Sequence, residues 1–487
     1  MSREKKIFRL LIVTTICILP VVFMKYNMDT DTWFILNLGR YTLHNGFVST
    51  DPFTMHEGLS YVFQQWLTGI YFWLIYSSIG EWGLYIAIVF ESILLLLLFY
   101  KLCMYLTDNF LVSAICTFGY SIFASVYMCT RPEILSYITA ISVIFLLEKY
   151  VRTGRYTYLC IIPLLSVLEI NLHAGVWWLL FLFMLPFICS FNKISTFKGM
   201  DNIQFKKFPI ILTALTSFAV GFINPYGYKS VFYLLLSGGA KNKTRISELQ
   251  PMVFTDSYGI ICFITVFIVV AFMICTKILS LRYFLLAGGT LIMGMMAYRN
   301  FAYAGMGLML YLSVLMSNAF KPEAFCHIHQ FSKRQQIIIN LAMLTYCIVE
   351  ILLSAFFIRN ADSQQELKDA YIILDYLDAN SGENRNLCTD FNYGAFFEFY
   401  GYKSSIDARM ELYTKRMNKK DDYFDEFMDF TTGEIYYDDY LTRYDFDYIV
   451  LKNKFIISLL EHDNRYECLV DTDTYDLWIR KWLHVWR

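Results

Sequence analysis

Long apolar runs are the feature that most restricts the fold of this chain. A membrane-spanning helix needs about 20 predominantly apolar residues, and such runs recur through residues 1–359 but are missing from residues 360–487. The chain is 57% hydrophobic and only 17% charged, which is typical of a polytopic membrane protein. The sequence therefore predicts an all-α membrane domain over residues 1–359 and a separate domain over residues 360–487.

The apolar runs predict about eleven transmembrane helices. The first run follows several basic residues, as a signal peptide would, but no small-x-small cleavage site comes after it, so we interpret it as a retained span. The predicted spans are residues 8–24, 83–106, 110–128, 134–149, 157–171, 175–191, 208–223, 258–276, 283–298, 301–318 and 336–358.

Basic residues between the spans set the predicted orientation. With the N-terminus in the cytoplasm, every predicted inner connection carries Lys or Arg, in agreement with the positive-inside rule. An odd number of spans then places residues 25–82, residues 224–257 and the C-terminal domain outside. The expected location is the plasma membrane, crossed many times, with the C-terminal domain on the extracytoplasmic side.

The net charge of −1 hides an asymmetry between the two predicted domains. Residues 360–487 hold 15 Lys and Arg against 26 Asp and Glu, which leaves 26 and 16 for residues 1–359. The acidic tail would repel phosphates, and the basic residues of the membrane domain lie in short loops between spans. We therefore expect no nucleic-acid partner.

Two further segments have readable local structure. Within the first outer loop, residues 25–82, the stretches WFILNLGRYTL and FQQWLTGIYFWLIY suit helices that lie in the membrane interface. The tail begins with a predicted helix, QQELKDAYIILDYLDA, followed by short β-type runs, NLCTDF, YDFDYIVLK, YECLVD and DLWIRKW, and by polar helical stretches. This alternation predicts an extracytoplasmic α/β domain.

Two carboxylates, Asp29 and Asp31, follow the first span directly. A carboxylate there can accept a proton from a hydroxyl group or bind a divalent cation, and the D-x-D spacing lets both side chains point at one ligand from an extended strand. Taken alone, the pair is explained better as two solvated loop residues, and both interpretations stay open.

The sequence around Asp29 and Asp31 resembles that of a known family. DTDTWFILNLGRYTLHNGFVSTDPFTMHEGLSYVFQQWL is similar to the first extracytoplasmic loop of bacterial GT-C-type glycosyltransferases that use polyprenyl-phosphate sugars. TRPEILSY, NLHAGVWWLL, INPYGYK, ISELQPMVF and YRNFAYAG resemble signatures of the same superfamily, and so do TDFNYGAFFEFYG, SIDARMELY and DFDYIVL in the tail. All of these motifs fall on the predicted outer face.

One departure from the family pattern affects the predicted site. Such loops often read D-x-D-x-W-W-H, whereas Phe34 and Ile35 follow Trp33 here. The role of the family's histidine is therefore either absent or taken by His44 or His56.

The resemblance implies inverting sugar transfer from a polyprenyl-phosphate donor to an extracytoplasmic acceptor. The acceptor is a glycan, lipid or protein of the cell envelope, and the implied process is polysaccharide biosynthesis. Asp31 is then the base or the acceptor-orienting carboxylate, and Asp29 is its partner. A divalent cation, Mg²⁺ or Mn²⁺, is a cofactor candidate with Asp29 and Asp31 as its ligands.

A leaving phosphate calls for cations, and the guanidinium fork of arginine matches phosphate oxygens. Arg131 and Arg299 are therefore the predicted phosphate-binding residues, and Asn300 is a candidate donor to sugar hydroxyls. An interfacial arginine that reaches toward lipid headgroups is the alternative for Arg131.

The remaining candidates each have a structural alternative. His173, with Glu169 one turn before it, would contact phosphate or help to hold a cation, or else it is a hydrogen-bonded histidine between helices. Glu248 would bind substrate, or else it is a solvated loop acid. Asn224 and Tyr226 of NPYGYK would bind substrate, or else backbone turn geometry explains them.

Two tail residues and two glutamates in apolar runs also have both a functional and a structural interpretation. Asp407 and Arg409 would shape an acceptor groove, or they form an ion pair inside the fold. Glu91 and Glu350 lie within apolar runs, where a charge is costly, and facing partners in the bundle are the simpler explanation. These two glutamates favour the rival function, a non-catalytic lipid-sugar flippase or an envelope-assembly scaffold.

Overall fold

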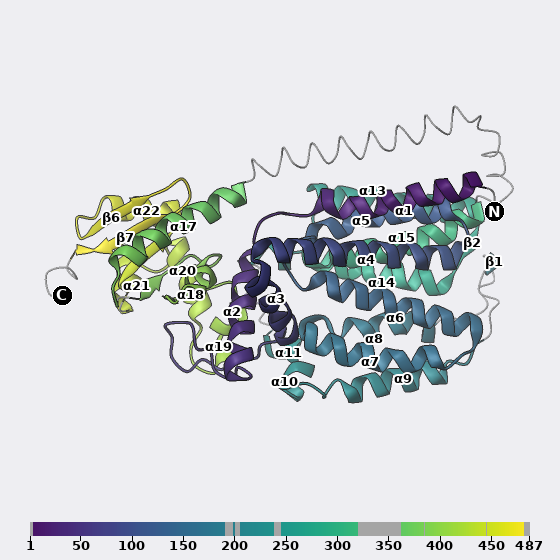
Figure 1. Cartoon of the computed structure of the whole chain (residues 1–487), viewed down its shortest axis with the longest axis horizontal. Coiled ribbons are helices and arrows are strands. Elements are labelled where there is room, and N and C mark those ends of the chain that lie inside the picture. Colours follow the sequence, from purple (N-terminus) through teal and green to yellow (C-terminus); the bar gives the residue numbers. More distant parts are fainter. Residues whose placement is uncertain are drawn as a thin grey trace, which may run out of the picture. The chain divides into compact units, whose positions relative to one another are not determined.

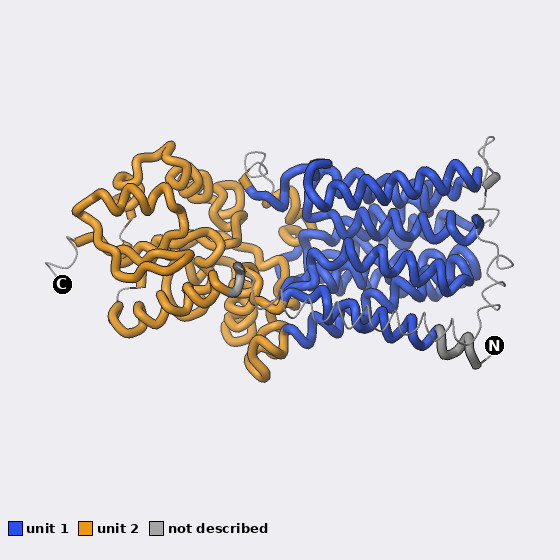
Figure 2. Tube along the Cα trace, turned by 90° about the horizontal axis from the view of Figure 1, so that it is seen from above, with its two compact units in different colours: residues 1–25, 85–227, 246–355 blue, residues 26–84, 228–245, 356–487 orange. Residues whose placement is uncertain are grey.

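A computed structural model describes residues 3–189, 198–199, 205–237, 245–319, 362–383, 385–444 and 446–481. The chain packs as two compact units, coloured blue and orange in Figure 2. Unit 1 comprises residues 1–25, 85–227 and 246–355, and unit 2 comprises residues 26–84, 228–245 and 356–487.

Unit 1 is a bundle of apolar helices that lie side by side (Figure 1). In the described part of this unit, four short 3₁₀ turns interrupt the connections: η1 (Ser125–Tyr127), η2 (Ala174–Val176), η3 (Ser247–Leu249) and η4 (Tyr298–Asn300). A two-residue parallel pairing joins β1 (Lys198–Gly199) to β2 (Ile278–Leu279). The helices are α1 (Arg3–Phe23), α4 (Glu81–Thr107, of which residues 85–107 belong to unit 1), α5 (Phe110–Ala124), α6 (Glu133–Thr153), α7 (Thr157–Leu172), α8 (Leu179–Cys189), α9 (Phe208–Val220), α13 (Ser257–Thr276), α14 (Leu281–Met296) and α15 (Phe301–Ala319).

Helix α15 lies in the interior of the bundle. All of its residues from Phe301 to Met316 are buried, and it packs against α5, α13 and α14. A helix that is apolar on every side is buried on every side. Two glycines allow its close packing: a Cβ atom at Gly305 would lie 2.1 Å from Phe123 Cγ, and one at Gly307 would lie 2.1 Å from Thr290 Oγ1. Small residues at helix contacts bring backbones together in membrane bundles.

The structure confirms that every predicted span before residue 320 coincides with apolar helix. Five stretches, which include the adjoining 3₁₀ turns, are long and apolar enough to cross a membrane, and the others are shorter apolar helices. The predicted span 336–358 lies outside the described residues, so the count of eleven and the orientation stay predictions. The five are Glu81–Thr107, Phe110–Tyr127, Glu133–Thr153, Ser257–Thr276 and Tyr298–Ala319.

Unit 2 contains a five-stranded mixed sheet in the order β4-β3-β5-β7-β6. β4, β3 and β5 are parallel, whereas β7 pairs antiparallel with β5 and with β6. The strands are β3 (Asn386–Cys388), β4 (Lys403–Ser404), β5 (Tyr448–Leu451), β6 (Tyr466–Asp471) and β7 (Asp476–Arg480). The helices are α2 (Thr30–Asn45), α3 (Trp66–Ile79), α10 (Tyr228–Val231), α11 (Tyr233–Ser237), α17 (Asp362–Asn380), α18 (Gly394–Phe399), η6 (Met410–Tyr413), α19 (Lys415–Asn418), α20 (Tyr423–Thr432), α21 (Tyr437–Arg443) and α22 (Lys454–Glu461).

The predicted tail elements are confirmed where the sequence pattern was strong. The helix expected over residues 364–379 is α17, and the four β-type runs contain β3, β5, β6 and β7. Strand β4 and helix α18 were not predicted, because two strand residues and six helical residues are too few for a periodic pattern.

The first outer loop is integrated into unit 2. Helix α2 is buried from Thr32 to Gly39 and packs against α3 and α18, where the Trp33 ring meets the Phe396 ring edge-on at 5.1 Å. Its apolar residues are therefore covered by protein. The interfacial placement of α2 and α3 stays a prediction.

The connector between α2 and α3 extends the edge of the tail sheet. Met55 N donates to Ser404 O at 3.0 Å, and Thr54 Oγ1 donates to the same oxygen at 3.0 Å. Ser404 belongs to the edge strand β4, so the connector satisfies part of an otherwise open edge. The predicted division at residue 359 rests on span content and stays a prediction, whereas the contacts group the connector with the tail.

Candidate functional site

Three motifs that are distant in sequence meet in unit 1. Arg131 precedes α6, Glu248 lies on η3, and Arg299 lies on η4. Arg131 Nη1 donates to both carboxylate oxygens of Glu248, at 3.0 and 3.2 Å. Arg299 is half-buried within electrostatic reach of this pair and of Tyr127 and Glu133. The two arginines and two glutamates, defined here as the arginine cluster, balance each other in charge.

Backbone geometry at the end of α14 positions Arg299. Ala297 is extended, with φ −155° and ψ 128°, and it ends the helix. Tyr298 N then donates to Gln250 O at 3.0 Å, which ties the η4 turn to the loop that carries Glu248. Asn300 Nδ2 donates to Met293 O at 3.1 Å, so this amide caps α14. The predicted contact of Asn300 with sugar hydroxyls would require that bond to be given up, and it stays a prediction.

A second group of polar side chains lies between α6 and α7. His173 is fully buried, and its Nδ1 lies 3.2 Å from Ser136 Oγ. Glu169, one helical turn earlier, is also buried and bonds to Ser136 and Thr139. Within the described residues, neither His173 Nε2 nor Glu169 Oε2 has a hydrogen-bond partner. His173 is within electrostatic reach of Arg299. The histidine between helices is therefore only half satisfied by protein, and its predicted contact with phosphate stays a prediction.

The NPYGYK turn supports the structural interpretation of Asn224. Its Nδ2 donates to Gly221 O at 2.8 Å and to Gly227 O at 3.1 Å, and its Oδ1 accepts from Tyr226 N at 2.9 Å. These bonds use both N–H donors of the amide and one acceptor position of its oxygen, as expected for an asparagine that builds a turn. Substrate roles for Asn224 and Tyr226 stay predictions.

Asp29 and Asp31 lie in unit 2, at the start of α2. Asp29 is the N-cap: its Oδ1 accepts from Asp31 N at 3.0 Å, which satisfies one of the open N–H groups of the helix. Asp31 lies in the first helical turn, and both side chains are half-buried. The prediction of an extended strand was wrong, because the cap starts a helix between the two residues. Their catalytic roles stay predictions.

The described residues do not contain a group of three His, Cys, Asp or Glu side chains arranged to hold a metal ion. Magnesium is often bound through one or two carboxylates together with water and substrate phosphate. Asp29 and Asp31 fit that smaller donor set, although capping already engages one oxygen of Asp29. The divalent cation therefore stays a proposal.

Unit 2 holds a buried ion cluster that joins the first outer loop to the tail. Arg409 pairs with Asp51 from the loop and with Glu398 and Asp407 from the tail, and all four side chains are at most 1% exposed. The Nη2–Glu398 Oε2 distance is 2.8 Å, and Tyr413 donates to Asp407 at 3.0 Å. The ion pair inside the fold is therefore the confirmed interpretation of Asp407 and Arg409.

Burial shapes the charges in this ion cluster. Burial, followed by repulsion from Asp407 and Asp51, holds the pKa of Glu398 well above its ordinary value. Burial alone would lower the pKa of Arg409, but the three carboxylates outweigh it, so the pKa is raised and the guanidinium stays charged. Sequence reasoning missed Asp51 and Glu398, because their partner lies 358 and 11 residues away.

His56 lies on the same connector as Asp51. Its ring stacks on Tyr423 with centroids 3.9 Å apart, and its Nε2 lies 2.9 Å from Ser405 O. Burial, aided by the charge of Lys420, lowers the pKa of His56 to about 4 against the opposing bond to Ser405. This histidine is therefore neutral at pH 7, with its Nε2 engaged in holding the connector on the tail.

We expect His56 to make unit 2 less stable in acid. An unfolded histidine takes up a proton below about pH 6.5, whereas folded His56 stays neutral down to about pH 4. The unfolded state therefore binds more protons in this window, and the free energy of unfolding falls by up to about 3 kcal/mol between pH 6.5 and 4. Urea unfolding at pH 7 and 4.5 should show this loss for the natural protein but not for His56→Gln. Parallel losses in both proteins would show that His56 titrates normally.

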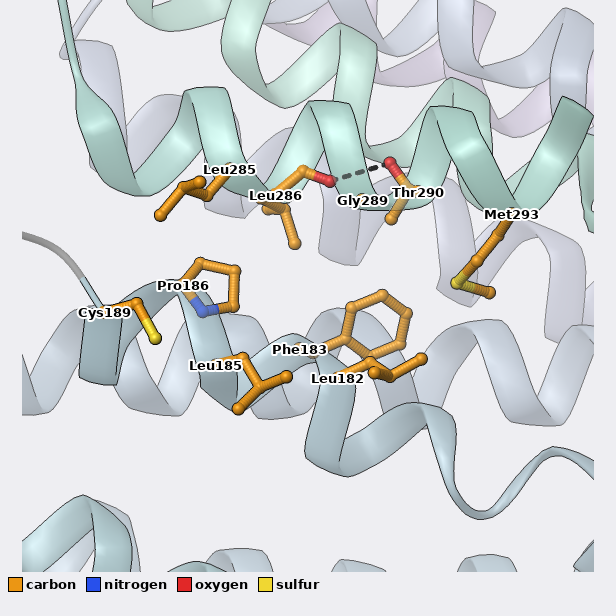
Figure 3. A pocket seen from close by; sticks show the side chains of 10 residues that line it. All are labelled: Leu182, Phe183, Leu185, Pro186, Cys189, Leu285, Leu286, Gly289, Thr290 and Met293. Carbon is orange, nitrogen blue, oxygen red and sulfur yellow. Dashed lines mark hydrogen bonds between the residues drawn. The ribbon is translucent and has the colours of Figure 1, made fainter.

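Unit 1 also contains an apolar cavity of about 300 Å³ between α8 and α14 (Figure 3). Thr290, a polar residue of its lining, donates its hydroxyl to Leu286 O at 2.9 Å, which leaves little polar character in the wall. Such a cavity suits hydrocarbon and offers no group for acid–base chemistry. The lining consists of Leu182, Phe183, Leu185, Pro186, Cys189, Leu285, Leu286, Gly289, Thr290 and Met293.

Comparison with known proteins places the fold. No family model and no curated protein sequence matches this chain. Its structure is similar to the crystal structure of the Archaeoglobus fulgidus oligosaccharyltransferase tethered with an acceptor peptide that contains the NVT sequon. The TM-score is 0.58 at 12% identity, over 93% of this chain and 70% of that chain. At this identity the likeness shows the fold alone, and it supports the predicted GT-C-type membrane fold.

Proposed function

We propose that this protein is a membrane glycosyltransferase that moves a sugar from a polyprenyl-phosphate donor to a cell-envelope acceptor outside the plasma membrane. The observation that carries the proposal is the arginine cluster. Arg131 and Arg299 come from separate motifs, and both belong to unit 1 within electrostatic reach of each other. Two guanidinium groups in a partly buried setting are suited to a phosphate that gains charge as it leaves.

The proposed reaction needs a base for the acceptor and cations for the leaving group. Asp31 takes the proton of the acceptor hydroxyl, or orients it, while that oxygen attacks the anomeric carbon of the sugar. The bond from this carbon to the lipid phosphate breaks on the opposite side, so the configuration inverts. The phosphate leaves as an anion and needs no general acid. Arg131 and Arg299 stabilise its charge.

The rival proposal is a lipid-sugar flippase or an assembly scaffold without catalysis. The two glutamates in apolar runs support this rival proposal. Glu91 is buried on α4, and Glu350 lies outside the described residues. Ionisable residues inside a bundle also pair with facing polar groups, and such pairing does not require transport. The arginine cluster favours the transferase, because two guanidinium groups within electrostatic reach of each other suit a leaving phosphate, whereas a scaffold does not need them.

Reconstitution separates the two proposals. The full chain is placed in proteoliposomes with a polyprenyl-phosphate sugar, and mass spectrometry follows both the lipid and the acceptor fraction. Formation of a new glycosidic bond with release of polyprenyl phosphate supports the transferase, whereas translocation of intact donor supports the flippase. Comparison of surface glycans and accumulated donor lipids between a deletion strain and its parent identifies the sugar and the acceptor.

A further inference from the structure

Glu248 forms an ion pair with Arg131, and a phosphate that binds Arg131 would have to break this pair. Both carboxylate oxygens contact the single nitrogen Nη1, at 3.0 and 3.2 Å. A bidentate pair uses two guanidinium nitrogens in parallel, which is the stronger arrangement. The Arg131–Glu248 contact is therefore close, but it lacks the fork geometry that makes such pairs strong.

The two partners differ in their exposure. The Arg131 side chain is 11% exposed, whereas the Glu248 side chain is 40% exposed. An exposed carboxylate regains water when it is released, so its departure costs little. A nearly buried guanidinium loses more when a carboxylate partner leaves it. Of the two partners, Glu248 is therefore the one that is released at the lower cost.

The backbone around Glu248 allows its side chain to move away from Arg131. Glu248 lies in the middle of η3, a single 3₁₀ turn closed by bonds from Leu249 N to Ile246 O and from Gln250 N to Ser247 O. Among the described residues, two backbone bonds tie the loop to the bundle after Glu248: Tyr298 N donates to Gln250 O, and Met252 N donates to Met295 O. Swinging the Glu248 side chain breaks neither of these ties.

Arg299 supplies the complementary half of a receptor. Its backbone is fixed by the η4 turn, yet no group among the described residues accepts a hydrogen bond from its guanidinium. Glu133, whose Oε2 is buried without a partner in the described part of the chain, lies within its electrostatic reach. With Glu248 in place the cluster is neutral, and with Glu248 displaced it carries one net positive charge.

We propose that Glu248 is an exchangeable occupant of the arginine cluster, and that a phosphate monoester or diester displaces it from Arg131 and binds between Arg131 and Arg299. This inference rests on the proposed function and deepens it, because it assigns Glu248 to competition with the phosphate of the donor. In the free protein the carboxylate keeps Arg131 paired and excludes other anions. In the bound protein the phosphate takes both arginines.

Direct binding of farnesyl phosphate to the purified full chain tests the exchange. Glu248→Gln keeps the shape but removes the competing charge, and exposed ion pairs are worth up to about 1 kcal/mol, a factor of about five. The variant is therefore expected to bind farnesyl phosphate about fivefold more tightly than the natural protein. Arg299→Met is expected to abolish binding in both backgrounds. Glu461→Gln, a change of an exposed glutamate on α22, should leave the affinity unchanged.

Controls identify the chemistry that is recognised. Farnesol, which lacks the phosphate, should not bind at the same concentration. Inorganic phosphate should compete with farnesyl phosphate if the protein recognises the phosphate group alone. An affinity of Glu248→Gln or Glu248→Ala equal to or weaker than that of the natural protein would overturn the exchange. Binding with the expected order but without sugar transfer would instead reject the proposed function and leave the exchange standing.

Discussion

Replacing Asp31 with asparagine is expected to lower the rate of sugar transfer by a factor of about 10² to 10⁴, the contribution of a positioned general base. Asparagine has the same shape but cannot take the proton of the acceptor hydroxyl. Membrane insertion should be unchanged, because Asp31 is half-buried in the first turn of α2, where an acidic residue contributes only about 0.3 to 1 kcal/mol. The measurement is the rate of transfer in proteoliposomes supplied with lipid-phosphate sugar.

Asp29 provides the matched control for Asp31. Asn and Asp are equally good N-caps, so Asp29→Asn keeps the bond to Asp31 N and with it the start of the helix. Asp29→Ala removes that cap and is expected to cost about 1 kcal/mol of stability. A loss of transfer with Asp31→Asn but not with Asp29→Asn assigns the chemistry to Asp31. Normal turnover by Asp31→Asn would remove this residue from the reaction.

Replacing Arg409 with glutamine is expected to destabilise unit 2 by about 3 to 5 kcal/mol, the usual cost of removing one partner from a buried ion pair. Asp51, Glu398 and Asp407 would remain buried, close together and without their cation. Because Asp51 belongs to the first outer loop, the same change should release the connector from the tail. Protease sensitivity of both segments across a urea series measures the loss.

Arg443 offers a matched surface control for Arg409. It pairs with Glu426, but its side chain is 64% exposed, and exposed pairs contribute about 0 to 1 kcal/mol. Arg443→Gln should therefore shift the urea midpoint only slightly. Asp51→Asn removes one of three like charges and should be milder than Arg409→Gln. Equal midpoints for the Arg409 and Arg443 variants would contradict the structural importance of the ion cluster.

Local rules explain which parts of the fold the sequence predicted. The apolar runs before residue 320 became helices at the expected places, because in a hydrocarbon environment each segment must satisfy its own backbone. Helix α17 and strands β3, β5, β6 and β7 also followed their local patterns. The strand predicted for D-x-D was wrong, because Asp29 is the N-cap of α2 and the helix begins between the two carboxylates.

The sequence also indicated which polar residues would share one end of the bundle. Counting spans and basic loops placed the motifs of Arg131, His173 and Arg299 on one face, and unit 1 brings Arg131 and His173 each within electrostatic reach of Arg299. Membrane orientation reduces the possible placements of a loop to two sides, so a sequence-level rule is informative there. Glu133 was missed although it follows Arg131 by two residues, because nothing local distinguishes it from a helix-starting acid.

By itself, the sequence determined the helices of the bundle, the α/β character of the tail and the candidate arginines. Only the tertiary structure decided that Glu248 pairs with Arg131 across 117 residues and that Asp51 meets Arg409 across 358. Span length and periodicity depend on neighbouring residues, and they can therefore be predicted from the local sequence. The choice of a partner for a buried charge depends on which distant side chains the packed core brings within hydrogen-bond distance, and no local pattern records it.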